Sequence, residues 1–332
     1  YATNIDIARN PNIMQPHKIF LSVGHDEYWS KEQRDHITAA GNNGKHLAFF
    51  SGNEVYWKTR WENSIDGSGT PFRTLVCYKE GTQGENTCGS KCDPSPEWTG
   101  LWRDGCTPTY TPNDGCQPEN ALTGQISWLG ANAAIEVPYA NKDFRFWRHT
   151  SISSLAQGQT ATLSSNTLGY ELDWEQPNGH YPSGRILLSS TNVSGKTHKL
   201  SLYKHSSGAW VFGAGTVQWS WGLDGTHDSG NSTEDPRMQQ ATVNLFADMS
   251  VQPGSLQATL TATTASTDIT APVTTINTPA HNQTVLSGIP ISISGTATDA
   301  NAVAGTEISV DGGSSWQPAN GTGQWSFTFT PA

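Results

Sequence analysis

The chain has 332 residues and a formal net charge of −10 at pH 7, which argues against nucleic acid or an anionic membrane surface as a partner. Only 14% of the residues are charged, and no apolar run is long enough to span a bilayer. Gly, Ser, Thr, Asn and Trp are abundant, a composition that favours an exported protein, secreted or at the cell surface. The length allows one large domain and one small one.

The most informative stretch, residues 18–57, predicts a strand, a helix and a second strand. Residues 19–23 are apolar and partly β-branched, as in a buried strand, and Ser30 with Gln33 forms a capping-box pattern that starts a helix. The Gly and Asn cluster at 41–44 ends this helix, and residues 46–50 read as a second buried strand. Together they predict a right-handed βαβ unit with parallel strands.

Polar side chains follow both strands where the strands end. In open α/β sheets this edge is where ligands bind. We therefore expect the following residues to face one crevice: His25, Asp26, Glu27 and Tyr28 after the first strand, and Glu54 and Tyr56 after the second.

Three chemistries can be considered for this crevice. A thiol nucleophile at the strand-to-helix turn is disfavoured, because residues 23–28 contain no Cys or Ser. A glycosidase pair could be drawn from Asp26, Glu27, Glu54 and Glu171, although the sequence does not fix their separation. Tyrosine and carboxylate oxygens would instead suit a hard ion such as Fe(III).

All five cysteines fall in one stretch rich in Gly, Pro and Asp. They are Cys77, Cys88, Cys92, Cys106 and Cys116. We favour a disulfide-stapled insertion at about 77–124 over a structural zinc site, because C-x2-C spacing is absent. An odd number leaves one thiol over, and Cys77, on an apolar run, is the candidate. The pairing of the others stays open.

The remaining elements complete a predicted α/β domain over residues 1–260, with a doubly wound, mainly parallel sheet. Before the βαβ unit, residues 5–7 are interpreted as the end of an edge strand. After the insertion we expect strands at 134–137, 185–190, 198–203 and 209–215, a loop at the same sheet edge over 216–222, and a closing helix at 239–249.

From about residue 261 the composition shifts to Thr, Ser, Ala and Pro, and we interpret 261–271 as a linker. Alternating stretches follow at 273–276, 289–294, 307–310 and 325–329, with a turn signal at 311–313. This pattern predicts an immunoglobulin-like β-sandwich over 272–332. It has fewer clear strands than the usual number of about seven, which indicates a truncated module or strands too weak to recognise.

Four motifs in combination resemble a known family. They are G-H-D-E-Y-W-S, S-G-N-E-V-Y-W-K, L-G-Y-E-L-D and G-A-G-T-V-Q-W-S-W-G-L, and they are similar to the C-terminal domain of the large (β) subunit of N,N-dimethylformamidase, over roughly residues 1–255. The resemblance implies a fold like that of class I glutamine amidotransferases and a mononuclear iron held by two tyrosines and one glutamate. By motif, these ligands fall on Tyr28, Tyr56 and Glu171. The segments A-P-V-T-T-I and S-V-D-G-G-S-S-W resemble bacterial Ig-like modules, which act as spacers.

The resemblance implies hydrolysis of a C–N bond in a small amide, with Fe(III) polarising the carbonyl or activating a water. His25, Asp26 or Glu27 would transfer protons, and Glu54 would orient a ligand or water. The cysteine insertion and the Ig-like region depart from the enzyme and leave the substrate open. The rival hypothesis is a bacterial surface component that uses the scaffold structurally, by self-assembly or with further Ig-like modules, or binds carbohydrate.

Overall fold

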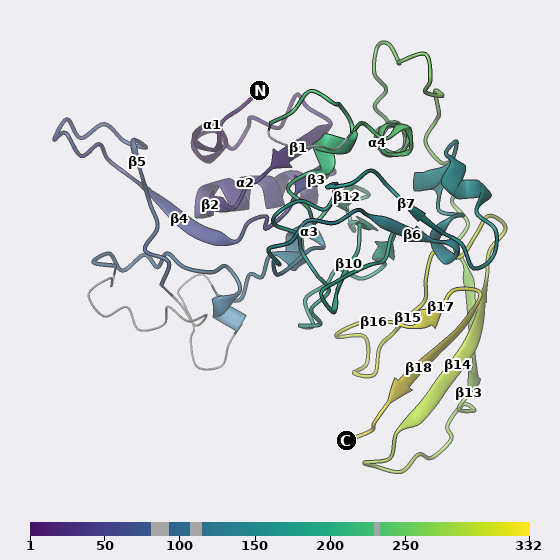
Figure 1. The fold of residues 1–332 in the computed structure, drawn as a ribbon. Coiled ribbons are helices and arrows are strands. Elements are labelled where there is room, and N and C mark those ends of the chain that lie inside the picture. The colour runs from purple at the N-terminus through teal and green to yellow at the C-terminus, as the bar shows by residue number, and fades with distance from the viewer. Residues whose placement is uncertain (81–92, 107–114, 229–232) are drawn as a thin grey trace.

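The computed structural model describes residues 1–80, 93–106, 115–228 and 233–332. Its first region is built on a five-stranded sheet (Figure 1). In spatial order the strands are β1 (Ile19–Gly24), β3 (His46–Ser51), β12 (Trp210–Gly213), β11 (Ser201–Lys204) and β8 (Ile186–Leu187).

The predicted βαβ unit is confirmed. Strands β1 and β3 are parallel, with Val23 opposite Phe50, and the helix α2 (Lys31–Asn42) connects them. The hydroxyl of Ser30 accepts a hydrogen bond of 3.3 Å from the backbone N–H of Gln33, as the capping pattern predicts. The carboxyl ends of β1 and β3 therefore lie at the same edge of the sheet.

The sheet as a whole is mixed, so the predicted doubly wound, mainly parallel sheet is not confirmed. Strand β12 is parallel to β3, but β11 is antiparallel to β12, and β8 is antiparallel to β11. Residues 205–209 alone connect β11 to β12, and so short a connection makes a hairpin, because a parallel pair needs a long crossover.

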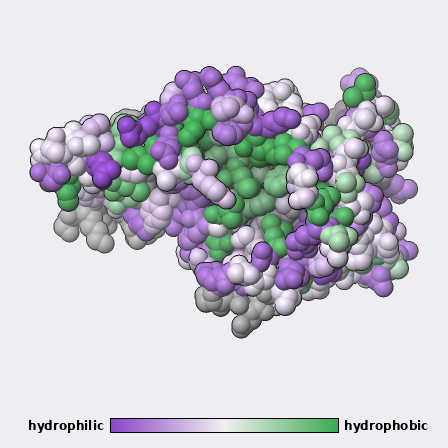
Figure 2. Space-filling view, turned by 90° about the horizontal axis from the view of Figure 1, so that it is seen from above, coloured by the Kyte–Doolittle hydropathy of each residue, from purple (hydrophilic) through white to green (hydrophobic). Residues whose placement is uncertain are grey.

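Each face of the sheet is covered by one longer helix. On one face, Ile37 of α2 packs in a cluster with Leu47 and Phe49. On the other face, α4 (Pro236–Asp248) packs Leu245 against the cluster that contains Phe212. Strand β1 is the uncovered edge strand, and it leaves Leu21 45% and Val23 51% exposed. Figure 2 views the molecule from above relative to Figure 1, and it shows hydrophobic residues gathered in the middle of this upper face.

The predicted N-terminal edge strand is wrong, because residues 4–9 form the helix α1 (Asn4–Arg9). Thr3 accepts a hydrogen bond from the backbone N–H of Asp6, and the Asp6 carboxylate accepts one of 2.9 Å from the backbone N–H of Thr3. This reciprocal capping box stabilises the first helical turn more strongly than the short apolar alternation of Ile5 and Ile7 favours a strand.

A second, three-stranded sheet extends from the two loops that follow β1 and β3. It contains β2 (Tyr28–Ser30), β4 (Trp57–Glu62) and β5 (Thr74–Val76). Strands β2 and β4 are parallel, with Tyr28 directly opposite Trp57, while β4 and β5 are antiparallel. Figure 1 shows this sheet projecting to the left of the central sheet.

Short elements fill the rest of the first region. The predicted strands at 185–190 and 198–203 are shorter than expected, because the first is reduced to β8 and the second is divided between two strands. The strands are β6 (Glu136–Pro138), β7 (Thr160–Thr162), β9 (Thr191–Val193) and β10 (Lys196–His198); the helices are α3 (Asn120–Thr123), η2 (Asp104–Cys106), η3 (Tyr139–Asn141), η4 (Arg145–Trp147), η5 (Ser151–Ser154) and η6 (Trp219–Gly222). No described helix is long and apolar enough to cross a bilayer.

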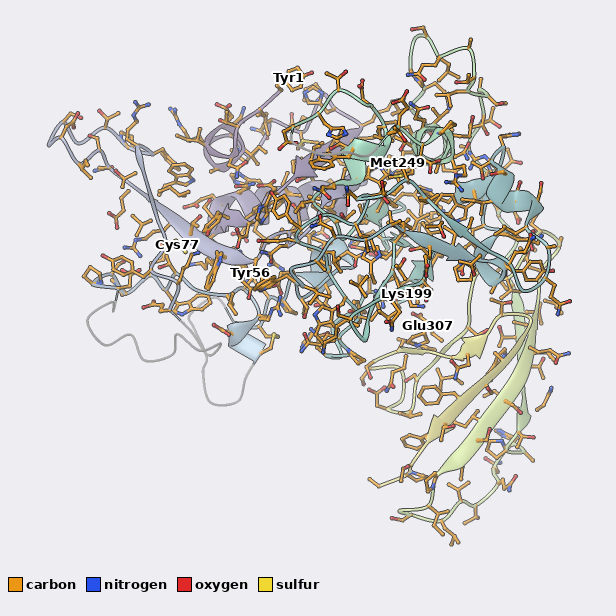
Figure 3. The ribbon with its side chains drawn as sticks, in the orientation of Figure 1. Tyr1, Tyr56, Cys77, Lys199, Met249 and Glu307 are labelled. Atoms are coloured by element: carbon orange, nitrogen blue, oxygen red, sulfur yellow. A yellow bond between two sulfur atoms is a disulfide. The ribbon has the colours of Figure 1, made fainter. Side chains whose placement is uncertain are left out.

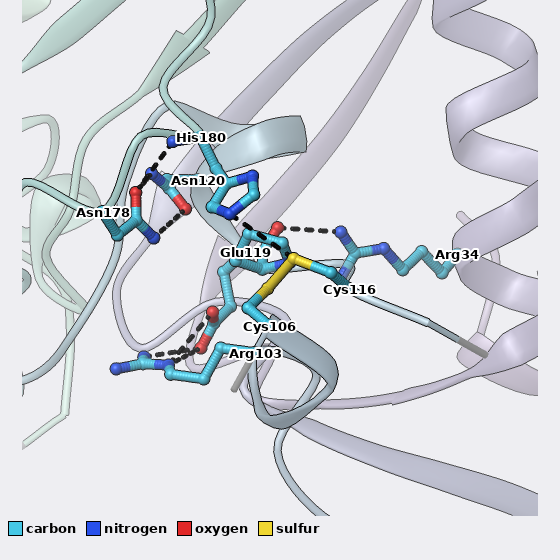
Figure 4. Close-up of a disulfide and its surroundings, with 9 residues drawn as sticks. Arg34, Arg103, Cys106, Cys116, Glu119, Asn120, Asn178 and His180 are labelled. Atoms are coloured by element: carbon cyan, nitrogen blue, oxygen red, sulfur yellow. Dashed lines mark hydrogen bonds and ion pairs between the residues drawn. A yellow bond between two sulfur atoms is a disulfide. The ribbon is translucent and has the colours of Figure 1, made fainter. Parts of the chain in front are cut away.

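The described cysteines support the disulfide interpretation. Cys106 and Cys116 form a disulfide (Figure 4), and Cys77 is a free thiol. Cys88 and Cys92 lie outside the described residues.

The C-terminal region is all β. A four-stranded sheet in the order β13-β14-β18-β17 packs with the hairpin β15-β16 around Ala297, Ile308 and Trp325. Glu307 meets the first region, because its Oε2 accepts a hydrogen bond of 2.6 Å from the backbone N–H of Gly184 (Figure 3). The strands are β13 (Val273–Thr278), β14 (Ile291–Thr298), β15 (Glu307–Ile308), β16 (Gln317–Pro318), β17 (Asn320–Gly321) and β18 (Gln324–Phe329).

Candidate functional site

Three loops meet at the carboxyl ends of β1, β3 and β12. The backbone N–H of Tyr56 donates to the carbonyl of Glu27 at 2.9 Å, and that of Thr216 donates to Ser51 at 3.0 Å. At Gly52 a Cβ atom would lie 2.8 Å from the backbone of Thr216. The loop after β3 is therefore held between the other two loops, and only glycine permits this close approach.

His25 contacts two carboxylates in this crevice. Its Nε2 lies 2.9 Å from Glu171 Oε2 and 3.3 Å from Glu27 Oε2. The amide of Asn53 contacts the same pair, because its Nδ2 donates to Glu171 Oε2 at 2.9 Å and to Glu27 Oε1 at 3.1 Å. The structure thus brings the predicted residues His25, Glu27 and Glu171 together, with the two carboxylates joined by the hydrogen bonds of Asn53.

The surroundings of Glu27 shift its pKa upwards. Burial raises the pKa of Glu27, the charge of His25 lowers it, and the nearby charge of Glu171 raises it again, so that the pKa is raised overall. A carboxyl group whose pKa is shifted towards neutrality can both give and take a proton.

Asp26 and Glu54 form a separate buried group behind this one. The hydroxyl of Ser22 on β1 lies 3.0 Å from Asp26 Oδ2 and 3.4 Å from Glu54 Oε2, and Asn4 Nδ2 donates to Asp26 Oδ1 at 3.1 Å. Burial raises the pKa of Asp26. Burial, and then the charge of Asp26, raise the pKa of Glu54 well above its usual value. Neither carboxyl group makes a described hydrogen bond to His25.

The two predicted tyrosine ligands lie beside Glu27 and next to cations. Tyr56 is 7% exposed, and the guanidinium of Arg103 lies 5.0 Å from the centre of its ring. Burial raises the pKa of Tyr56, and the charge of Arg103 lowers it in part. Tyr28 is half-buried, and Lys79 Nζ lies 5.2 Å from the centre of its ring. Figure 3 shows Tyr56 near the side of the molecule that carries Cys77.

The donor set fits a hard metal ion. The predicted ligand set, Tyr28, Tyr56 and Glu171, carries oxygen donors only, which hard cations prefer over nitrogen or sulfur. The Lys79 ammonium and the Arg103 guanidinium each lie against one of the two phenol rings.

The residues that organise these groups, Asn53 and Asp173, are not among the predicted site residues. Asn53 stands in the quoted motif S-G-N-E-V-Y-W, and its left-handed conformation, with φ of 47°, is one that Asn adopts more readily than most residues. Asp173 in L-G-Y-E-L-D accepts a 3.1 Å hydrogen bond from the backbone N–H of Asn53. The available signal for Asn53 was an Asn directly after a Gly at the end of a strand, whereas no local signal identifies Asp173.

Two other features lie outside this crevice. Among the described His, Cys, Asp and Glu side chains, Cys106, Cys116 and His180 have ligand atoms within 4.8 Å of one another, but the two sulfurs are joined in the disulfide (Figure 4). A pocket of about 230 Å³ is lined by Arg34, Leu47 and other residues, and by none of the predicted site residues.

The two tryptophans of the loop after β12 have packing roles. Trp219 is 0% exposed, and its ring centre lies 5.5 Å from that of Phe212. Trp221 stacks on His227 with the ring centres 4.3 Å apart.

The chain contains four Asn-x-Ser/Thr sites, at Asn192, Asn231, Asn282 and Asn320. Of these, Asn231 lies outside the described residues.

Comparison with protein-family models gives two matches. Residues 1–239 match the model described as N,N-dimethylformamidase beta subunit-like, C-terminal. Residues 272–332 match the model described as bacterial Ig domain. A comparison with curated proteins gave no significant match.

Proposed function

Because the chain belongs to the N,N-dimethylformamidase beta subunit-like, C-terminal family, we propose that its first region is a hydrolase that cleaves the C–N bond of a small amide. The contact of His25 Nε2 with Glu171 at 2.9 Å and Glu27 at 3.3 Å carries the proposal. An imidazole held between two carboxylates, at the sheet edge where ligands bind, is suited to proton transfer in such a reaction.

The residues of this group divide the work of hydrolysis. Water adds to the carbonyl carbon, a proton reaches the amide nitrogen, and the C–N bond breaks to release a carboxylic acid and an amine. His25 takes the proton from the water and returns it to the nitrogen, while Glu171 and Glu27 stabilise the imidazolium formed in between. Asn53 fixes both carboxylates, so that the imidazole keeps its orientation.

Tyr28, Tyr56 and Glu171 would hold an iron ion, which supplies Lewis-acid polarisation of the amide carbonyl. The oxygen-only donor set and the cations beside both phenols support this part of the proposal. Glu54 and Asp26, bonded to Ser22 behind the crevice, would support the backbone that carries the tyrosines.

We further propose that the protein is exported, secreted or displayed on a bacterial surface. The disulfide between Cys106 and Cys116 supports this, because disulfides persist in oxidising compartments. The bacterial Ig match over residues 272–332 is also in keeping with an extracellular protein with further modules.

The rival function is a scaffold that binds carbohydrate or other surface components without catalysis. The Ig-like region is the observation that favours it. Under this rival, the tyrosines only pack and His25 only fixes the loops.

The deciding experiment measures iron content and the visible spectrum of the purified protein after iron is supplied, followed by a screen of formamides and small amides. We expect one iron per chain and a tyrosinate-to-iron charge-transfer band. Tyr28→Phe and Tyr56→Phe should each weaken the band, whereas Tyr139→Phe, at an exposed tyrosine outside the crevice, should leave it unchanged. A protein that takes up no iron and cleaves no amide would leave the rival function.

A further inference from the structure

The segment from Cys77 to Glu80, here called the strap, crosses the second sheet beside the candidate site. Cys77 Sγ donates to the carbonyl of Lys58 on β4 at 3.7 Å. The backbone N–H of Tyr78 donates to the Thr99 hydroxyl at 2.9 Å, and that of Glu80 donates to the Thr99 carbonyl at 3.1 Å. Bonds to two different segments therefore fix the strap on both sides of Lys79.

Lys79 itself has an unfavourable backbone conformation. Its φ is 53°, in the left-handed region that costs a non-glycine residue about 1 kcal/mol or more. Such a conformation persists where the surroundings enforce it, and here the hydrogen bonds of Tyr78 and Glu80 do so.

The ammonium of Lys79 lies against both Tyr-Trp motifs at once. Its Nζ is 5.2 Å from the ring centre of Tyr28 and 4.9 Å from that of Trp57. Tyr28 and Trp57 are direct partners across the parallel strands β2 and β4, so that one cation spans a cross-strand pair. Cation–π contacts of this kind are worth about 0.5–2 kcal/mol, depending on exposure.

We propose that Lys79 is a positioning residue of the candidate site, which holds the rings of Tyr28 and Trp57 in place through its cation–π contacts. The inference rests on the proposed function and deepens it, because it assigns the beginning of the cysteine-rich insertion a role in the site. A positioning residue beside metal ligands typically changes metal affinity by about 10–100-fold when it is removed.

The first test measures iron affinity and the position of the charge-transfer band in Lys79→Gln and Lys79→Arg. We expect Lys79→Gln to weaken iron binding about tenfold or more and to shift the band, and Lys79→Arg to restore most of both. The matched control is Lys204→Gln, because Lys204 Nζ lies 5.6 Å from the ring centre of Trp210, which begins β12 and so lies at the opposite end of that strand from the crevice. Equal iron affinity and an unshifted band in Lys79→Gln and wild type would overturn the proposal.

The second test needs no iron and so separates this inference from the proposed function. The midpoints of thermal unfolding of metal-free wild type, Lys79→Gln, Tyr28→Leu and the double variant form a double-mutant cycle. Tyr28→Leu removes the ring, so the cycle reports the contact between the ammonium and the ring. We expect the two shifts to be non-additive. Additive shifts overturn the inference whether or not the wild type binds iron, while coupled shifts in a protein that binds none would support the contact and reject only the proposed function.

Discussion

His25 Nε2 lies 2.9 Å from Glu171 Oε2, so the loop after β1 and the L-G-Y-E-L-D segment, far apart in the sequence, meet in one contact. The side chains are 29% and 24% exposed, open enough for a small substrate to reach them. This contact places an imidazole beside a carboxyl group at the sheet edge where ligands bind. The predictions on catalysis follow from it.

His25→Gln should lower kcat/KM for the amide substrate by about 10²–10⁴-fold, the usual range for loss of a general acid–base group. The midpoint of unfolding should change little, because the side chain is partly exposed. His205→Gln is the matched control, since His205 is a half-buried histidine bonded to Ser207, outside the crevice. Equal activity of wild type and His25→Gln would show that His25 has only a structural role.

Gly52→Ala should disturb the site without touching any predicted catalytic side chain. A Cβ atom there would lie 2.8 Å from the backbone of Thr216 and Val217, so the loop after β3 or the loop after β12 must move. We expect kcat/KM to fall by about tenfold or more, because small misplacements of a catalytic group are costly. At Gly254 no atom lies within 4 Å of an added Cβ, so Gly254→Ala should behave as wild type in the same assay.

Local signals explain why the βαβ unit could be predicted. The capping hydroxyl of Ser30, the apolar run before Gly24 and the glycines that end α2 all act within a few residues. The same kind of signal was present at Thr3 and Asp6, but the interpretation of residues 5–7 as a strand overlooked it. The mixed sheet was not predictable in this way, because the direction of β11 depends on its pairing with β12 and β8.

The candidate site was predictable only as far as the carboxyl ends of neighbouring strands define one edge. From that rule, His25 and Glu27 were predicted to lie in the crevice. It could not distinguish them from Asp26, whose side chain binds Ser22 instead. The contact of Lys79 with Tyr28 depends on where the insertion folds back onto β4, which no periodicity in the sequence records.

Phe212→Ala should destabilise the first region by about 3–5 kcal/mol, because it removes a large buried ring and leaves a cavity. Phe212 is 0% exposed, and its ring centre lies 5.3 Å from that of Phe146 and 5.6 Å from that of Phe50. Denaturant unfolding measures the change in the free energy of unfolding. Leu21→Ala is the control: Leu21 is 45% exposed on the uncovered edge strand β1, and its replacement should cost well under half as much.

Asp173→Asn should stabilise the protein at alkaline pH. Burial raises the pKa of Asp173 to about 8, and the charges of Glu119 and Glu171 add to this against the effect of Arg103. The folded state therefore holds a proton that the unfolded chain, with an Asp pKa of about 4, has already lost. Because the folded state binds more protons, its stability falls as the pH rises from about 4 to 8, by about 1.4 kcal/mol per pH unit.

The asparagine amide resembles the protonated carboxyl and keeps an oxygen for the 3.1 Å bond from the Asn53 backbone N–H, but it does not ionise. Burial lowers the pKa of His198 to about 4, so His198 adds its own pH dependence below about 6.5, and the comparison is cleanest from pH 6.5 to 8. In that window the free energy of unfolding of wild type should fall with pH more steeply than that of Asp173→Asn, by up to about 1.4 kcal/mol per pH unit. Asp143→Asn, at a side chain 68% exposed, should follow wild type, and parallel curves for wild type and Asp173→Asn would show that Asp173 is ionised in the folded protein.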